Sequence, residues 1–245
     1  MWAISSAISK FDAARGALLR KKPMEKGAFE ELSARARHRA FTVANVSQMD
    51  LIAQTLESLA DAIHEGQSLD EWRARIGDAL ETAWSGTVAN PPWRLETIYR
   101  TNLQNAFAAG RLEQQTQPEI LAARPYWLFD ATIDGRQSQV CEFCDGTILP
   151  AGDPWWRGHR PPLHFNCRSD VVTLDREDMD ELVKTGRYKF HGTPIPAQEG
   201  FAQPPALTNY AFTDAVKKYR GASVADVGVD QLIAAAERKQ RGAGL

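Results

Sequence analysis

The sequence predicts an α+β fold, in which a mainly helical N-terminal half precedes a small β module and further helices at the C-terminal end. Up to about residue 117, apolar residues recur at every third or fourth position, the period of a helix that buries one face. Between residues 125 and 175, short aromatic and β-branched runs are bounded by turn residues, which is typical of short strands. The change of period near residue 125 therefore separates two kinds of structure.

Composition excludes several classes of protein. The chain has 245 residues, of which 43% are hydrophobic and 24% are charged, so it can bury a core and is not disordered, collagen-like or a coiled coil. It has no apolar run of about 18 residues, so no transmembrane helix is predicted. Residues 1–8 lack the basic region and long apolar stretch of a secretory signal. Three cysteines do not suit a disulfide framework and favour a reducing compartment.

Three helices are predicted between residues 41 and 117. The first ends near Gly66 and carries an apolar stripe of Met49, Ile52, Leu56, Leu59 and Ile63. Ser68 and Glu71 form a capping box that begins the second, whose inner side carries Leu69, Trp72, Ile76, Leu80 and Trp84. The third begins at Pro91, runs to about Gln115 and buries Leu95, Ile98, Tyr99, Leu103, Ala106 and Phe107.

The β module is predicted over residues 125–175. Strands are expected at 126–129, 147–149 and 171–174, with a turn at Asp134 and Gly135. A polar helix over about 175–185 ends at Gly186 and closes the module. Residues 191–207 hold four prolines and two glycines, which indicates a linker or extended arm before helices at about 208–220 and 226–239.

These patterns divide the chain into three parts. Residues 1–40 form a basic helical arm, broken at Pro23, with nine lysines and arginines against four acidic residues. Residues 41–190 form the central domain, with helices over 41–117, the β module over 125–175 and the closing helix over 175–186. Residues 191–245 form the Pro-rich linker and the C-terminal helices. Both ends are basic around an acidic middle, so they are either arms for nucleic acid or an acidic partner, or solvated helix faces.

Four candidate metal ligands lie in two pairs. Cys141 and Cys144 form a Cys-x2-Cys pair, and nineteen residues separate it from the His-x2-Cys pair of His164 and Cys167. Three thiolates and one neutral imidazole complete the tetrahedral shell of a structural zinc ion, and Gly146 permits a tight turn after the first pair. One structural zinc per chain is therefore predicted to support the β module. Free thiols, a disulfide between Cys141 and Cys144, and chance spacing are the alternatives.

No catalytic centre is predicted. A zinc with four protein ligands has no open position for water, and three thiolates leave a bound water poorly acidic. The nearby acids and bases do not assemble a nucleophile, a base and an orienting group; they are Asp145, Asp153, His159 and Asp170. The chain is therefore predicted not to be an enzyme. His164 and Asn166 beside the cysteine pairs keep a zinc-stabilised nuclease as the alternative.

Two arginines of the third helix are candidate contact residues. Arg100 and Arg111 lie eleven residues apart, about three helical turns, so both project from one face. We expect them to face the β module, where at least one pairs with Asp130 or Asp134. The alternative is two independent surface arginines.

Trp155 and Trp156 lie in the loop between the two ligand pairs, followed by Pro161 and Pro162. They form either the small core that a metal-supported module needs or an exposed platform for a partner.

Four sequence elements occur in order within residues 45–175. They are Ile-Tyr-Arg-Thr-Asn-Leu-Gln-Asn-Ala-Phe-Ala-Ala-Gly-Arg at 98–111, Asp-Gly-Arg at 134–136, Cys-x2-Cys-x-Gly at 141–146, and Pro-Pro-Leu-His-Phe-Asn-Cys-Arg-Ser at 161–169. Together they resemble the phage Mu protein F-like family of minor head proteins of tailed phages, also called head morphogenesis proteins. The last element is the most specific. Members of the family often have Thr where this chain has Gln137.

The resemblance implies a minor head (capsid) protein of a tailed phage or prophage, acting in head morphogenesis near the portal and in DNA packaging or ejection. The implied partners are the portal protein, the major capsid protein and packaged double-stranded DNA, without a membrane or a small-molecule substrate. The implied location is the inside of the virion head, and the host cytoplasm during assembly. No enzymatic activity is implied. The candidate structural or interaction residues are Arg100, Arg111, Asp134, Arg136 and Arg168. A zinc-containing nuclease and a zinc-ribbon or DNA-binding module are the alternatives.

Overall fold

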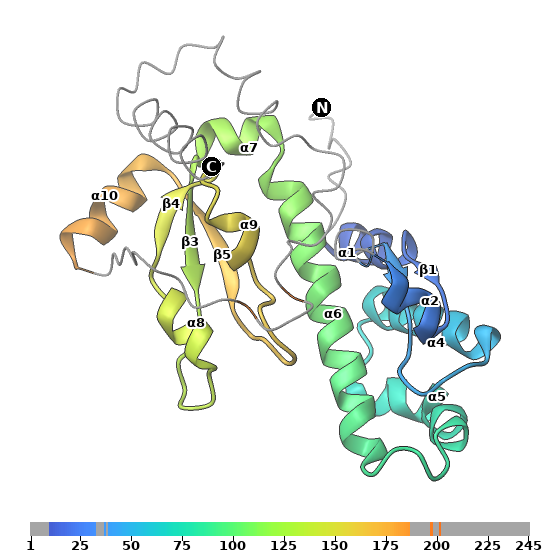
Figure 1. Ribbon diagram of the computed structural model, residues 1–245. Helices are drawn as coiled ribbons and strands as arrows, with labels where there is room; N and C mark the ends of the chain where they lie inside the picture. The colour runs from blue at the N-terminus through green and yellow to red at the C-terminus, as the bar shows by residue number, and fades with distance from the viewer. Residues whose placement is uncertain (1–9, 33–36, 38, 187–196, 198–200, 202–245) are drawn as a thin grey trace, which may run out of the picture. The chain divides into compact units, whose positions relative to one another are not determined.

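A computed structural model describes residues 10–32, 37, 39–186, 197 and 201 (Figure 1). The chain divides after Glu113 into two compact units. Described elements of the first unit are mainly helical and the second contains a three-stranded sheet, which confirms the α+β prediction. Within the described ranges, no helix is both long and apolar enough to cross a bilayer. The predicted Pro-rich linker and C-terminal helices lie outside the described residues, apart from Ala197 and Phe201.

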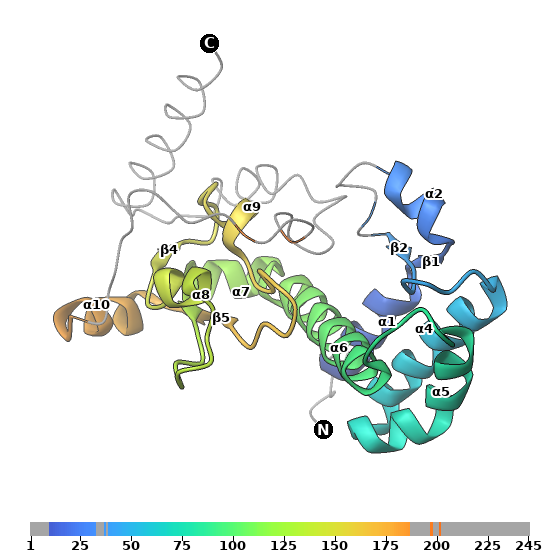
Figure 2. The same cartoon turned by 60° about the horizontal axis from the view of Figure 1, so that its bottom comes forward.

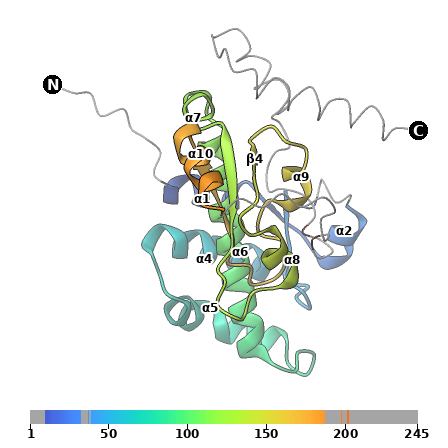
Figure 3. The ribbon, with the colours of Figure 1, turned by 90° about the vertical axis from the view of Figure 1, so that its left-hand side faces the viewer.

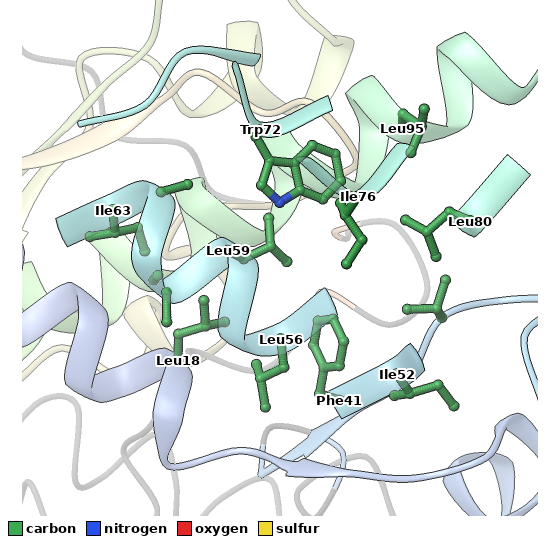
Figure 4. Packing of buried hydrophobic residues seen from close by; sticks show 14 of the residues in the cluster. Leu18, Phe41, Ile52, Leu56, Leu59, Ile63, Trp72, Ile76, Leu80 and Leu95 are labelled. Carbon is green, nitrogen blue, oxygen red and sulfur yellow. The ribbon is translucent and has the colours of Figure 1, made fainter. Parts of the chain in front are cut away.

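The first unit is built on the three helices that the sequence predicts: α4 (Met49–Glu65), α5 (Leu69–Ala83) and the part of α6 (Pro91–Gln115) that precedes the division. Gly66 ends α4 with a φ of 69°, and the predicted capping box of Ser68 and Glu71 begins α5. The helices α4 and α5 lie side by side (Figure 2). Their apolar stripes form one core (Figure 4), which includes Ile52, Leu56, Leu59, Ile63, Trp72, Ile76, Leu80 and Leu95.

The N-terminal residues include a helix that belongs to this core. The helix α1 (Lys10–Leu19) packs against α4, and its Ala14 and Leu18 are fully buried. It also lies very close to α6, because a Cβ at Gly110 would stand 2.7 Å from the backbone nitrogen of Ala14. The prediction that residues 1–40 form an arm outside the core is therefore wrong for α1. Its small and apolar side chains face inward, while most of the basic residues that gave residues 1–40 the charge of an arm follow α1 in the chain.

Two short strands, which the sequence did not predict, follow α1. Strand β1 (Lys22–Pro23) pairs in parallel with β2 (Ala40–Phe41), and α2 (Lys26–Glu31) lies between them in the chain. The predicted break at Pro23 is confirmed, since Pro23 ends β1 and no helix crosses it. Phe41 then enters the helical core, so this pairing ties the N-terminal segment to the rest of the unit.

The second unit contains an antiparallel sheet in the order β4-β3-β5, formed by β3 (Tyr126–Asp130), β4 (Ile148–Pro150) and β5 (Asp170–Leu174). These are the three predicted strands. The closing helix α10 (Arg176–Lys184) is confirmed as well. Three short helices were not predicted: α7 (Pro118–Ala123), α8 (Gln139–Cys144) and α9 (Trp156–His159).

The sheet has an apolar layer on each face. On one face, α10 covers Tyr126, Ile148 and Leu174 with Met179 and Leu182. Figure 3 shows α10 on this side and α8 and α9 on the opposite side. The outer edge of β5 is closed by side chains, since Gln115 Nε2 donates to the Val171 carbonyl (2.7 Å) and Arg124 Nη2 donates to the Thr173 carbonyl (2.8 Å). Those carbonyls are therefore not available to another strand.

Candidate metal centre

The first ligand pair lies on a single helical turn. Ser138 caps α8, where its Oγ accepts a hydrogen bond from the Cys141 backbone N–H (3.3 Å). Cys144 is the last residue of the helix, and both cysteine side chains are buried. The predicted tight turn follows: Gly146 has a φ of 73°, and its N–H donates to the Phe129 carbonyl (2.9 Å). A short helix anchored to β3 therefore holds the pair.

The second ligand pair lies on residues 163–167, which we call the ligand loop. Leu163 is fully buried and fixes the start of the loop. Asn166 has a φ of 57°, a left-handed conformation that Asn tolerates better than most residues. The Cys167 N–H donates to the His164 carbonyl (3.3 Å), so the turn brings the two ligand residues to the same side.

Three of the four predicted ligands meet. Cys141 Sγ lies 3.2 Å from His164 Nε2 and 3.7 Å from Cys167 Sγ, and the three ligand atoms all lie within 4.8 Å of one another. Two thiolates bound at about 2.3 Å to one tetrahedral zinc lie about 3.8 Å apart, and a thiolate and an imidazole lie about 3.5 Å apart. The sulfur–sulfur distance fits this geometry, and the sulfur–nitrogen distance is slightly shorter than it.

The imidazole of His164 is oriented for a metal. Its Nδ1 lies 2.8 Å from the Phe165 carbonyl oxygen, a contact in which only a protonated Nδ1 can donate. In the neutral imidazole that a metal would bind, Nε2 carries the lone pair, and it is Nε2 that faces Cys141 Sγ. Without a metal, a proton on the same Nε2 can be donated to the Cys167 thiolate. Metal-binding histidines are usually held by such a hydrogen bond from the second ring nitrogen.

The electrostatics of the cluster favour one thiolate. Hydrogen bonding from Cys141, and then from His164, lowers the pKa of Cys167 well below that of an ordinary thiol, although burial opposes the shift. The Cys167 thiolate in turn raises the pKa of Cys141 and, by accepting a hydrogen bond, that of His164. An anionic sulfur with a second sulfur and an imidazole nitrogen beside it offers suitable ligands to a soft divalent cation.

Cys144 is not part of the three-residue cluster. It is fully buried, and burial followed by the nearby charge of Cys167 raises its pKa to about 12. All three cysteines are free, so the alternative of a disulfide between Cys141 and Cys144 is not formed. The residues present fit a metal with two sulfur ligands and one nitrogen ligand, and Cys144 lies one helical turn from the first of them.

An ion-pair network joins the Asp-Gly-Arg turn to the end of the ligand loop. Arg168 donates to both carboxylate oxygens of Asp134 (2.7 Å each), and Arg136 Nη2 donates to the same carboxylate (2.8 Å). Arg168, and then Arg136, hold the pKa of Asp134 well below its usual range. Gln137 Oε1 accepts hydrogen bonds from the backbone N–H groups of Gly135 (2.7 Å) and Asp134 (3.2 Å). The side chain of Gln137 therefore stabilises the turn.

Arg100 forms an ion pair within its own helix, and the predicted pairing of Arg100 or Arg111 with Asp130 or Asp134 stays a prediction. Arg100 Nε donates to Glu96 Oε1 (2.6 Å), one turn earlier on the same helix, and both side chains are exposed. The partners of Asp134 are Arg136 and Arg168. Helical spacing fixed the side of α6 on which Arg100 lies, but a carboxylate four residues away competes locally for the guanidinium. Arg111 is also exposed.

The aromatic residues between the ligand pairs contribute to the core. Trp156 is buried and packs edge-on against Trp127, with ring centroids 5.6 Å apart. Trp155 contacts Phe129 (6.3 Å) and stacks on His159 (4.4 Å). This supports the prediction that the tryptophans form the small core of the module.

A buried arginine was missed by the sequence analysis. Arg160 is 3% exposed, its guanidinium lies 4.4 Å from the centre of the Trp127 ring, and it donates to the side-chain oxygen of Gln115. Gln115 also donates to the Val171 carbonyl, so Arg160, Gln115 and Val171 form a chain of hydrogen bonds that reaches the outer edge of β5. An arginine directly before two prolines gave no sequence signal of burial.

The candidate acids and bases of the rival nuclease have structural contacts. Asp145 accepts from the Ala131 N–H (2.9 Å), Asp153 from the Trp155 N–H (2.8 Å) and Asp170 from the Val171 N–H (2.7 Å). Among the described residues, the cysteine and histidine cluster is the one group of three or more metal-binding side chains.

Comparison with known proteins assigns the family. The model of the family described as "Phage Mu protein F like protein" matches residues 53–172, a range that contains both ligand pairs and the Asp-Gly-Arg turn. Residues 53–172 belong to the phage Mu protein F-like family. The family assignment made from the four motifs is thereby confirmed.

Two curated relatives support the assignment. Protein F of Escherichia phage Mu, named as a capsid assembly protein, is 32% identical over 168 residues, which are 63% of this chain and 38% of that protein. The Mu-like prophage FluMu F protein of Haemophilus influenzae is 31% identical over 156 residues, 60% of this chain and 37% of that protein. The chain thus spans less than two fifths of the length of either relative. No solved structure matches the chain.

Proposed function

We propose that the chain is a component of the head of a tailed phage or prophage and acts in head assembly without catalysing a reaction. The observation that carries this proposal is the match of residues 53–172 to the Mu protein F-like family, together with a relative named for capsid assembly. In its finer form, the chain is a minor head protein beside the portal, which contacts the portal protein, the major capsid protein and packaged DNA. Its location is then the inside of the head, and the host cytoplasm during assembly.

We also propose that one zinc ion per chain supports the second unit. Cys141, His164 and Cys167 would bind it, and their spacing and the orientation of His164 support this assignment. Cys144, buried one turn from Cys141, would supply the fourth ligand. When bound, zinc supplies a cross-link between α8 and the ligand loop, which are separated by eighteen residues of chain.

The test of the head role uses particles. The gene would be deleted from its phage or prophage and complemented with the wild-type chain, with Cys167→Ser or with Val183→Ala, an exposed position on α10 that serves as the control. We expect the wild type and the control to restore DNA-filled heads that contain the chain, and Cys167→Ser to fail. Normal heads from the deletion strain would refute a role in assembly.

A second candidate function, a zinc-containing nuclease, rests on one observation. The cluster has three ligands, and a zinc with three protein ligands keeps a position for a reactive water. An assay of plasmid DNA cleavage by the purified chain, with and without added divalent metal, distinguishes a nuclease from a non-catalytic head protein. We expect no cleavage above the level of Cys167→Ser, because the proposed fourth ligand, Cys144, leaves no position for water.

A further inference from the structure

The ligand loop presents an aromatic side chain to the C-terminal part of the chain. Phe165 lies between the ligand residues His164 and Cys167 and is 51% exposed. Its ring meets that of Phe201 edge-on, with centroids 5.0 Å apart and planes at 83°. This is the preferred geometry of an aromatic pair. Phe201 lies beyond α10 and beyond the residues matched by the family.

The backbone on which Phe165 stands is held by hydrogen bonds of the two flanking ligand residues. The Phe165 carbonyl oxygen accepts the hydrogen bond from His164 Nδ1, and the turn at Asn166 closes through the bond from Cys167 N–H to the His164 carbonyl. The backbone of Phe165 is therefore tied to both ligand residues that flank it. A bound ion would hold those residues together and keep the ring where Phe201 meets it.

We propose that the ligand loop is the docking site for Phe201 of the same chain, which seats its ring on Phe165, and that metal binding keeps this site formed. The docking rests on the ring contact, while its control by metal rests on the proposed zinc. Fourteen residues of sequence separate Gly186 from Phe201.

Hydrogen exchange followed by mass spectrometry tests the docking in the full chain. We expect Phe201→Ala and Phe165→Ala each to raise the exchange rate of the amides around residue 201 by roughly two- to tenfold, the effect of losing one aromatic pair. The double variant should exchange no faster than either single variant, because both remove the same contact. Val183→Ala, an exposed apolar residue on α10, is the control and should leave the rate unchanged. Wild-type amides that already exchange as fast as those of Phe201→Ala would overturn the docking.

The control by metal is measured separately. Removing zinc with a chelator should raise exchange around residue 201 in the wild type to the level of Phe201→Ala, while Phe201→Ala itself keeps its full zinc content. Unchanged exchange after demonstrated zinc loss would overturn the control by metal. Wild-type protein that contains no zinc would refute the zinc proposal instead, and the comparison of the phenylalanine variants would still decide the docking.

Discussion

Replacing Gly110 with alanine should destabilise the helical unit. An added Cβ would stand 2.7 Å from the backbone nitrogen of Ala14, 3.0 Å from the carbonyl carbon of Ala13 and 3.1 Å from its Cβ. None of these atoms is the end of a flexible side chain, so α1 must shift away from α6. Such overpacking costs about 1–3 kcal/mol, and the better helix propensity of alanine returns about 0.5–1 kcal/mol. We expect a net loss of about 1–2 kcal/mol, or a melting temperature lower by about 2–8 °C.

Thermal unfolding followed by circular dichroism measures this difference. Gly27→Ala is the matched control, because Gly27 lies in α2 and an added Cβ there meets no atom within 4 Å. The control should be neutral or stabilising by up to about 1 kcal/mol. If Gly110→Ala melts at or above the temperature of the wild type, α1 does not pack against α6 as the structure shows.

Three further predictions concern charged side chains. The native pKa of Asp134 is depressed, so its ion pairs stabilise the fold above about pH 4, and this contribution is lost as the pH falls. The difference in melting temperature between the wild type and Asp134→Asn should therefore shrink from neutral pH to about pH 2. A difference that stays constant over this range would contradict the prediction. Arg160→Ala should cost about 2–4 kcal/mol in urea unfolding, and a double-mutant cycle with Gln115→Ala should show coupling. Arg100→Ala should lower the free energy of unfolding by no more than about 0.5 kcal/mol, because its pair with Glu96 is exposed. A loss of several kcal/mol would instead indicate that Arg100 forms a buried ion pair.

Helical periodicity, caps and strand composition predicted the main elements because these signals are local. The stripe that ends at Gly66 and the capping box of Ser68 each act within a few residues, and the structure contains both. The position of α1 could not be predicted in this way. The basic charge of residues 1–40 suggested an arm, whereas the packing of α1 depends on Gly110, which lies almost a hundred residues further along the chain. A glycine inside a helix was the available signal, since it often marks a close approach of two backbones.

Ligand spacing pointed to the residues of the candidate metal centre, but it did not predict which of them lie in contact. The spacing predicted four ligands. In the structure, Cys141, His164 and Cys167 lie together and Cys144 lies outside that cluster. Contacts of the arginines were harder to predict, because a guanidinium has many carboxylates within reach. Arg168 found Asp134 thirty-four residues away, a pairing that no local pattern encodes.

The zinc content of the purified chain tests the central claim most directly. The protein would be prepared under reducing conditions without added metal and analysed by mass spectrometry of the elements, beside Cys167→Ser and Cys144→Ser. We expect about one equivalent of zinc in the wild type and a large loss in Cys167→Ser. With cobalt in place of zinc, Cys144→Ser should lose about a third of the thiolate charge-transfer absorption, as expected if three cysteines bind the metal. Less than about half an equivalent of zinc in the wild type would contradict the account and leave the three cysteines as ordinary buried thiols.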